Sequence, residues 1–512
     1  MPEAKRFPRG GVATPHYLAS SAGLAVLAEG GNAIDAAVAA NLTLGVVTPY
    51  FCGYGGDLFA VVWDGQLHGY LGSGRSAATA SLEGLQSEFD LMPIYGCHTV
   101  TVPGGPAGWF ALLERWGSRS FGDVAAAALR YALDGFEITG AAGEIFEGCR
   151  HLYAEFPDWI AAYGEATTGG VLRQPAMART IECLASDGPD AYYHGPIADA
   201  IATAVQAAGG ALTTDDLAAH TGRFAEPLRA PYREVEIAEL PPPTQGVTAL
   251  EALRILDGAP LPAEGADRQH RLVEATTLAL ADREQYVSDP DAMPVPAATL
   301  LADEWVEGRR RILDPARAAA EVTGAGRRGG TAYLCAADAD GLLVSLIQSN
   351  FLAFGSGVHV PEWGINLNNR GSSFSLDPTS VNVLAPSKLP MHTLIPAMAL
   401  RGGEPWLVFG SMGGDAQAQV HVQLMAHVVD DGADPQVAID APRWRVEPAS
   451  GQLLSERRFP PEFLDGLRAR GHTVQAVRSL DSGMGHAHAI LRTLGGYAIA
   501  TDPRAEGAAL GL

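Results

Sequence analysis

The stretch that most constrains the fold of this chain runs from residue 329 to residue 361 and begins Gly-Gly-Thr. Residues Thr331 to Asp338 alternate and are rich in strand formers, residues 338–341 (Asp-Ala-Asp-Gly) have the composition of a turn, and residues 342–348 form a second apolar run. Two strand-forming runs around a short turn that contains glycine predict a β-hairpin.

The start of this hairpin also has a chemical interpretation. Two glycines before a hydroxyl residue permit the strained backbone that brings the Thr331 hydroxyl to the Gly330 carbonyl. An N→O acyl shift and hydrolysis would then leave Thr331 with a hydroxyl nucleophile and a free α-amine that serves as its general base. The local pattern alone favours the alternative, which is an ordinary turn that leads into a strand.

Several segments of the chain resemble one known family. The frame from Thr331 to Asp338, with Gly341 and Phe354-Gly-Ser-Gly357 after it, resembles the start of the small subunit of the γ-glutamyltransferase family of N-terminal nucleophile hydrolases. Further segments that resemble this family are GGNAIDAAVA (30–39), the glycine-rich loop 53–57, PPPTQG (241–246) and FGSMGGD (409–415). The resemblance covers residues 11–512 and favours a branch near the acylases and small-amide hydrolases.

The resemblance implies a fold of the α/β (α+β) class. This is the four-layer αββα sandwich, in which two stacked and mostly antiparallel sheets are covered by helices. Residues 1–330 would form the large subunit and residues 331–512 the small subunit, with cleavage between Gly330 and Thr331. The two cleaved chains would stay associated, and a homodimer is a further expectation.

The resemblance also assigns catalytic roles. Thr331 takes the position of the nucleophile, and Ser349 takes that of a hydroxyl residue which hydrogen-bonds the nucleophile and assists processing. Gly413 and Gly414 match the glycines of the oxyanion hole, and successive backbone N–H groups before a helix suit an oxyanion physically. Ala332 stands where relatives usually carry a threonine, and we expect slower processing as a result.

Six residues fall near the family's substrate-binding positions: Arg75, Asn350, Arg370, Ser373, His392 and Thr393. Arg370 and Ser373 replace groups that bind the α-ammonium of a glutamyl substrate, and His392-Thr393 replace paired serines. A guanidinium group repels an ammonium and binds a carboxylate in a bidentate manner. We therefore expect a small amide substrate with an acidic or neutral acyl part.

Three functions stay open at this point. One is an autoprocessing threonine hydrolase or acyltransferase that acts on γ-glutamyl compounds such as glutathione through an acyl-enzyme. The second is an acylase or small-amide hydrolase without γ-glutamyl specificity. The third is an inactive relative that serves as a binding or scaffold protein, which Ala332 and Tyr333 favour and the retained Thr331, Ser349 and Gly413-Gly414 disfavour.

Composition and charge exclude other classes. The net charge of −23 argues against nucleic acid and anionic membranes as partners. The sequence contains no run of about 18 apolar residues, so no membrane span is predicted. The N-terminal residues lack a signal-peptide pattern, and we expect a cytoplasmic protein. The five cysteines are scattered and form no CxxC pair, and the His486-Ala-His488 pair has no acidic partner spaced nearby. These patterns predict neither a metal site nor another cofactor.

Secondary-structure patterns fill in the rest. Periodicity predicts helices over residues 16–29, 33–47, 247–256, 417–429 and 461–470. It also predicts mostly helical stretches, broken by Gly and Pro, over residues 106–136, 138–154 and 172–207. A strand is predicted over residues 232–240, and a polar, flexible tail over residues 314–330.

Overall fold

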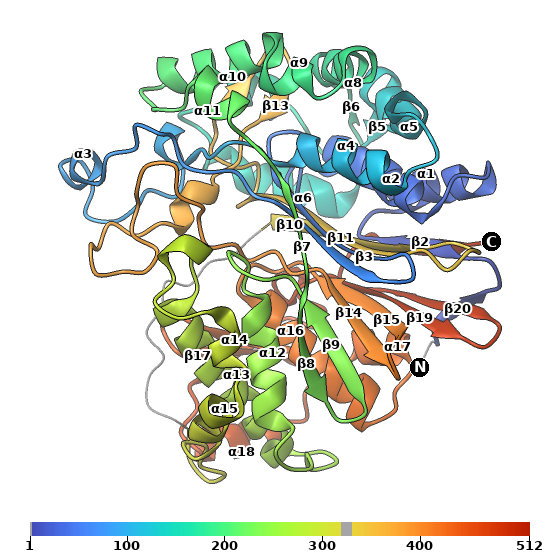
Figure 1. Cartoon of the computed structure of the whole chain (residues 1–512), viewed down its shortest axis with the longest axis vertical. Helices are drawn as coiled ribbons and strands as arrows, with labels where there is room; N and C mark the ends of the chain where they lie inside the picture. Colours follow the sequence, from blue (N-terminus) through green and yellow to red (C-terminus); the bar gives the residue numbers. More distant parts are fainter. Residues whose placement is uncertain (1–2, 319–329) are drawn as a thin grey trace.

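Two seven-stranded antiparallel sheets lie face to face at the centre of the molecule (Figure 1). The computed structural model describes residues 3–318 and 330–512. The first sheet has the strand order β21 (Ala508–Gly511), β2 (Gly11–Thr14), β10 (Gly330–Ala337), β11 (Leu343–Phe351), β3 (Asp57–Trp63), β4 (Leu67–Gly72) and β7 (Arg223–Ala225). The second has the order β1 (Lys5–Phe7), β20 (Gly496–Thr501), β19 (Ala487–Thr493), β15 (Glu404–Ser411), β14 (Ala397–Arg401), β9 (Val235–Glu239) and β8 (Leu228–Tyr232).

Helices cover the outer face of each sheet. The helices drawn above the first sheet in Figure 1 include α1 (Tyr17–Ala28), α2 (Ala33–Val47), α4 (Gly105–Trp116), α5 (Phe121–Asp134), α6 (Gly140–Arg150), α8 (Pro175–Asp187), α9 (Asp190–Tyr193) and α10 (Pro196–Ala207). Those below the second sheet include α12 (Gly246–Leu256), α13 (Ala266–Tyr286), α15 (Asp303–Arg310), α16 (Ala416–Met425), α17 (Pro435–Asp440) and α18 (Pro461–Ala469). A small sheet of β16 (Trp444–Glu447), β17 (Gln452–Glu456) and β18 (Val474–Val477) lies beside them.

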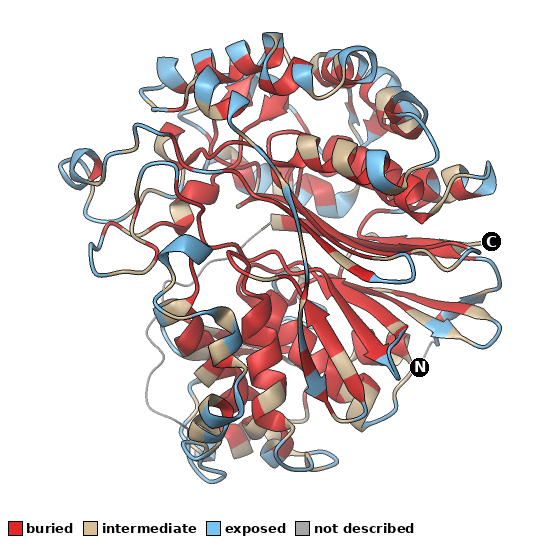
Figure 2. Ribbon diagram, viewed as in Figure 1, coloured by how far each residue is buried: buried red, intermediate tan, exposed pale blue. Residues whose placement is uncertain are grey.

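Three buried apolar clusters correspond to the three contacts between the four layers. One fills the space between the sheets and includes Phe59, Ile347 and Met398. A second joins the first sheet to its helices, and a third joins the second sheet to its helices. Figure 2 shows that the inner strands of both sheets are almost wholly buried, whereas the edge strands β1, β7 and β8 are partly exposed. The predicted αββα sandwich is therefore confirmed.

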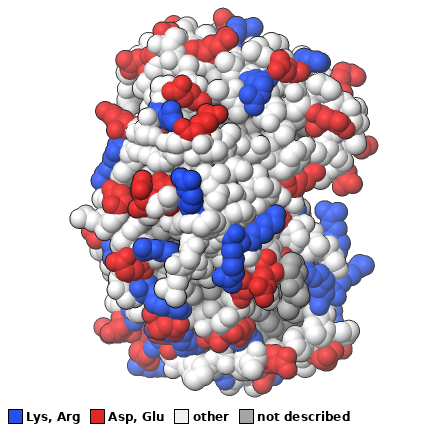
Figure 3. Space-filling view, turned by 90° about the vertical axis from the view of Figure 1, so that its right-hand side faces the viewer, with Lys and Arg blue, Asp and Glu red and all other residues white. Residues whose placement is uncertain are grey.

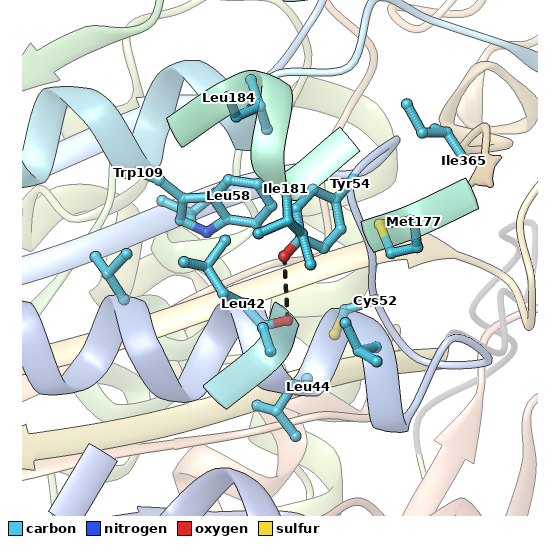
Figure 4. Close-up of a cluster of buried hydrophobic side chains, with 14 of the residues drawn as sticks. Leu42, Leu44, Cys52, Tyr54, Leu58, Trp109, Met177, Ile181, Leu184 and Ile365 are labelled. Atoms are coloured by element: carbon cyan, nitrogen blue, oxygen red, sulfur yellow. Dashed lines mark hydrogen bonds between the residues drawn. The ribbon is translucent and has the colours of Figure 1, made fainter. Parts of the chain in front are cut away.

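Helix α2 shows why the first sheet needs a second helical layer. All of its residues are buried, since it lies between the sheet and outer helices such as α5, and its sequence is apolar or small on every side. In Figure 4, Leu42 of α2 lies among Tyr54, Trp109 and Ile181, and the Tyr54 hydroxyl donates to the Leu42 carbonyl at 3.5 Å. A capping box formed by Asn32 and Asp35 begins the helix.

Both sheets combine strands from either side of position 330. Strands β10 and β11 lie between β2 and β3 in the first sheet, and β14 pairs with β9 in the second. The proposed large and small subunits would therefore share one core and would not fold as separate domains.

Most of the predicted elements are present. The hairpin at residue 331 is confirmed, with Tyr333 opposite Ile347 and the Asp338 carboxylate accepting from backbone N–H groups of its turn. The predicted strand over 232–240 is wrong in one respect, because Tyr232 ends β8 and a turn at Arg233 (φ 54°) leads into β9. Most of the predicted tail over 314–330 lies outside the described residues.

Surface charge and helix hydropathy bear on two classes of element, a basic face and a membrane-spanning helix. On the face that Figure 3 shows, acidic and basic side chains are interspersed, and the described residues there form no continuous basic surface. Within residues 3–318 and 330–512, no helix has the length and apolar character that a membrane crossing requires.

The helix-to-sheet core can be tested at Trp109. Its ring is fully buried and its indole N–H donates to Asn41 Oδ1 at 2.6 Å. We expect Trp109→Ala to lower the free energy of unfolding by about 3–5 kcal/mol, because it leaves a cavity. Leu494 is wholly exposed, so Leu494→Ala should change this free energy by less than about 0.5 kcal/mol. Urea unfolding measures both variants. Equal effects of the two variants would contradict the packing described above.

Candidate active site

The predicted nucleophile lies at the N-terminal end of the central strand β10, on the edge of the first sheet that strand ends form, where the pairing is irregular. Gly330 pairs with Phe351 and Ala332 pairs with Gln348, so Thr331 faces two residues, Ser349 and Asn350. This β-bulge re-aims the side chains at the strand end. Phe351 has a φ of 81°, which is strained for a residue other than glycine.

A chain of hydroxyl groups links Thr331 to the carbonyl before it. Thr331 Oγ1 donates to Ser349 Oγ at 3.2 Å, and Ser349 Oγ donates to the Gly330 carbonyl at 2.5 Å. Ser349 Oγ also accepts from the Phe351 N–H at 2.7 Å, which fixes its orientation. Ser349 thus lies within hydrogen-bond distance of Thr331, and both hydroxyl residues are buried.

Residue 330 has to be small. A Cβ atom at Gly330 would lie 2.7 Å from the Tyr50 carbonyl oxygen, which is closer than real Cβ contacts allow. Glycine at this position therefore permits the approach of the backbone that the sequence predicted.

The two predicted oxyanion glycines lie in residues 412–415, which connect β15 to α16 and are called the oxyanion loop below. Gly413 and Gly414 have φ values of 141° and 59°, a region that favours glycine. Their carbonyls accept from Ala416 N and Gln417 N at the start of α16. Gly413 and Gly330 line the same cavity of about 460 Å³, so the loop and the predicted cleavage site share one space.

Arg370, His392 and Thr393 come together beside this edge. The Arg370 guanidinium is buried, lies 3.9 Å from the centre of the Phe351 ring and donates to Thr393 Oγ1 at 3.3 Å. His392 Nε2 contacts Asp57 Oδ2 at 2.9 Å. Asp57 is the cross-strand partner of Ser349, so these groups adjoin the hydroxyl chain.

Burial controls the charges in this group. Burial raises the pKa of Asp57 to about 7, although the Arg370 charge and the N–H groups of Gly104 and Gly74 oppose the rise. Burial also holds the pKa of His392 well below its ordinary value, and Arg370 adds to this effect. The Leu394 N–H points at His392 Nδ1 at 3.5 Å, which assigns the proton of a neutral imidazole to Nε2, where it donates to Asp57.

The remaining predicted substrate residues are placed differently. Ser373 ends the short 3-10 helix Arg370–Ser373 and is buried. The Asn350 side chain lies under the glycine loop, where a Cβ at Gly56 would approach its Oδ1 to 2.6 Å. Arg75 bonds Asp289 Oδ2 at 3.2 Å and the Ser387 carbonyl at 2.8 Å, and it lines a separate cavity of about 160 Å³. Substrate binding by Arg75, by Asn350 and by the other four predicted residues stays a prediction.

Several further residues of this site have no clear signal in the sequence. Asp57 follows two glycines at a strand start, which is a weak signal for a buried carboxylate. Gln245, Arg283 and Asp415 connect the oxyanion loop to Thr393 through hydrogen bonds across distant parts of the chain. Spacing along the sequence contains no signal for such contacts.

Histidine clusters have protein partners. His421 contacts Glu239, His486 contacts Ser482 and His488 contacts Thr501. Among the described residues, His270, Glu274 and His472 form a further group that could hold a metal ion. His270 Nδ1 and His472 Nε2 are only 2.8 Å apart, whereas two nitrogens on one tetrahedral zinc lie about 3.3 Å apart. A hydrogen bond between the imidazoles accounts for this distance.

Known proteins share this architecture. The chain is 38% identical to the oxamate amidohydrolase proenzyme of Klebsiella pneumoniae subsp. pneumoniae, over 97% of each chain. It is 36% identical to the glutathione hydrolase-like YwrD proenzyme of Bacillus subtilis, over 98% of each chain. The crystal structure of cephalosporin acylase from Bacillus halodurans superimposes with a TM-score of 0.94 at 35% identity, covering 100% of this chain and 97% of that one.

These relatives differ in their named substrates but share one family. The family model described as gamma-glutamyltranspeptidase matches residues 19–512, which include every strand of the two sheets except β1 and β2 and every residue of the candidate site. The protein therefore belongs to the gamma-glutamyltranspeptidase family of enzymes.

Proposed function

We propose that the chain cuts itself between Gly330 and Thr331 and then hydrolyses small amides whose acyl part carries a carboxylate. The observation that carries this proposal is the hydroxyl chain from Thr331 to the Gly330 carbonyl, next to a buried guanidinium at Arg370. The relative named oxamate amidohydrolase supports it, because oxamate bears a carboxylate directly beside its amide.

Self-cleavage proceeds through an ester. Thr331 Oγ1 attacks the Gly330 carbonyl carbon, the C–N bond breaks, and the nitrogen leaves as the α-amine of Thr331 after taking the hydroxyl proton. Ser349 Oγ donates to the carbonyl oxygen under attack and thereby polarises it. Water then hydrolyses the ester, which frees the carboxylate of Gly330 and restores the Thr331 hydroxyl.

Turnover repeats this chemistry on a substrate. Thr331 Oγ1 attacks the substrate amide while the α-amine of the same residue takes the proton and later gives it to the departing amine. The N–H groups of Gly413 and Gly414 stabilise the oxyanion. Water resolves the acyl-enzyme, and Arg370 with Thr393 holds the substrate carboxylate.

A second candidate is hydrolysis or transfer of γ-glutamyl groups. The family and the glutathione hydrolase-like relative support it. Arg370 disfavours it, since a buried guanidinium opposes the ammonium group of a glutamyl substrate.

Self-cleavage is tested at Thr331. Thr331→Ala removes the nucleophile and should leave a single intact chain, whereas the unaltered protein should separate into two chains after Gly330. A mass spectrum of the denatured protein measures this. Thr379→Ala alters an exposed threonine far along the chain and should cleave normally. Cleavage of the Thr331→Ala protein at the same bond would contradict the assignment.

Carboxylate recognition is tested at Arg370. Arg370→Met should lower kcat/KM for oxamate about 10- to 100-fold, because it removes charge-assisted hydrogen bonds. The neutral amide pyruvamide should be affected far less. Ammonia release measures both reactions. A clear preference for γ-glutamyl anilides that survives Arg370→Met would favour the second candidate.

The charge of Asp57 predicts a pH dependence. Ionised Asp57 offsets the positive charge of Arg370, whereas protonated Asp57 does not. Oxamate should therefore bind less tightly as Asp57 ionises, and its KM should rise as the pH rises through about 7. KM for pyruvamide should stay flat over the same range. Asp57→Asn should remove the rise. A KM for oxamate that falls with rising pH would contradict this account.

A further inference from the structure

We infer that Gln245 and Arg283 are positioning residues that hold the oxyanion loop against the segment that carries His392 and Thr393. The inference rests on the proposed function, which assigns Gly413 and Gly414 to the oxyanion.

Gln245 joins two parts of the site through one side chain. Its Nε2 donates to the Thr393 carbonyl at 2.9 Å and to the Gly414 carbonyl at 3.0 Å. Its Oε1 accepts from Arg283 Nη1 at 2.6 Å, and its backbone N–H donates to the His392 carbonyl at 2.8 Å. The side chain is fully buried, so water cannot replace these bonds.

The chemistry of the partners fixes the orientation of this amide. A guanidinium group can only donate, so the atom that faces Arg283 must be oxygen. The nitrogen then faces two carbonyls and uses both of its hydrogens. The Gln245 amide oxygen thus faces a donor and its nitrogen faces two acceptors. The reversed orientation would place the nitrogen against Arg283 and the oxygen against two carbonyls, which is unfavourable.

Arg283 in turn holds both Gln245 and the end of the oxyanion loop. Its Nη1 donates to Asp415 Oδ1 at 2.6 Å, and the neighbouring carboxylates of Asp415 and Glu284 keep the pKa of the buried guanidinium above its ordinary value. Asp415 occupies the N-cap of α16 but makes no side-chain cap hydrogen bond. Aspartate at this position usually accepts from the helix N–H groups, whereas Asp415 directs an oxygen to Arg283.

The loop needs such support because glycine does not restrict its own backbone. Gly413 and Gly414 can adopt many φ and ψ values, and they have no side chains that could pack. The Gly414 carbonyl is fixed by two donors, Gln417 N from the helix and Gln245 Nε2 from the opposite side. This carbonyl belongs to the peptide plane between Gly414 and Asp415, so holding it limits the rotation of the adjoining plane, which carries the Gly414 N–H and whose Gly413 carbonyl accepts from Ala416 N.

The bridge also connects recognition with catalysis. The Thr393 carbonyl accepts from Gln245, and the Thr393 hydroxyl accepts from Arg370. Because Gln245 contacts the Thr393 backbone and not the Arg370 guanidinium assigned to the substrate carboxylate, a change at Gln245 should disturb the transition state more than the ground state, and appear in kcat more than in KM.

Two nearly isosteric variants test the inference. Gln245→Glu can still accept from Arg283, so its charge is paired, but it cannot donate to either carbonyl. Gln245→Met removes all of these side-chain hydrogen bonds. We expect kcat for oxamate to fall about 100-fold in both variants, as when one oxyanion donor is lost. KM should stay within about threefold, because ground-state contacts are retained. The cleaved fraction, measured by mass spectrometry, gives the concentration of active enzyme.

Gln269→Met is the matched control. Gln269 is another buried glutamine, lies fourteen positions before Arg283 on the same helix α13, and accepts from Trp444 Nε1 at 2.8 Å. It should lower Tm while kcat stays within about twofold of the unaltered enzyme. The inference would be overturned if the Gln245 variants, like the control, had a lower Tm but a kcat close to that of the unaltered enzyme.

A second readout does not depend on the substrate. Gly413 and Gly330 line one cavity, so the rate of self-cleavage during cell-free translation should fall in the Gln245 variants and not in Gln269→Met. If the Gln245 variants do not fold, Asp415→Asn keeps the side-chain volume, weakens the Arg283 contact and should lower kcat about tenfold at unchanged KM; an unchanged kcat would overturn the inference. Absence of cleavage and hydrolysis in the unaltered protein would instead refute the proposed function.

Discussion

The pairing of β10 with β11 is the interaction on which the site depends. These strands lie in the interior of the first sheet, and the bulge in their register places Thr331 opposite Ser349 and Asn350 at the end of the pair. The bulge at this point costs one regular pair and a strained Phe351, yet it lets the Ser349 hydroxyl reach both Thr331 and the Gly330 carbonyl. A regular ladder would direct these side chains to fixed faces and would not form this chain of hydroxyl groups.

Around that edge, the protein keeps an unusual amount of charge out of water. Arg283, Arg370 and Asp57 are all almost fully buried, and burial of an ion is expensive unless other groups compensate for the lost hydration. Backbone N–H groups and a neutral histidine surround Asp57, and two acidic side chains and an amide surround Arg283. Replacing such groups with apolar side chains often stabilises a fold, so their presence at one edge favours a role in function.

The sequence supports some levels of this structure better than others. Local patterns predict the hairpin at residue 331 and helices such as α2, because alternation, turn composition and capping residues are close in sequence. The turn at Arg233 was missed because it contains neither glycine nor proline. The layered fold came from the resemblance to a family and not from these patterns. The contacts of Asp57 and Gln245 join residues more than a hundred positions apart, and no local rule predicts them.

The interleaving of strands from both sides of position 330 has a consequence for the life of the cut enzyme. Once the bond is broken, neither piece can complete a sheet alone, since β10 and β11 need β2 and β3 as neighbours. Unfolding would then release two molecules where the precursor releases one. Recovery would require an encounter between partners and would become slower on dilution. A single intramolecular cut would thus turn a protein that can refold by itself into one whose native state lasts only as long as its two chains stay associated.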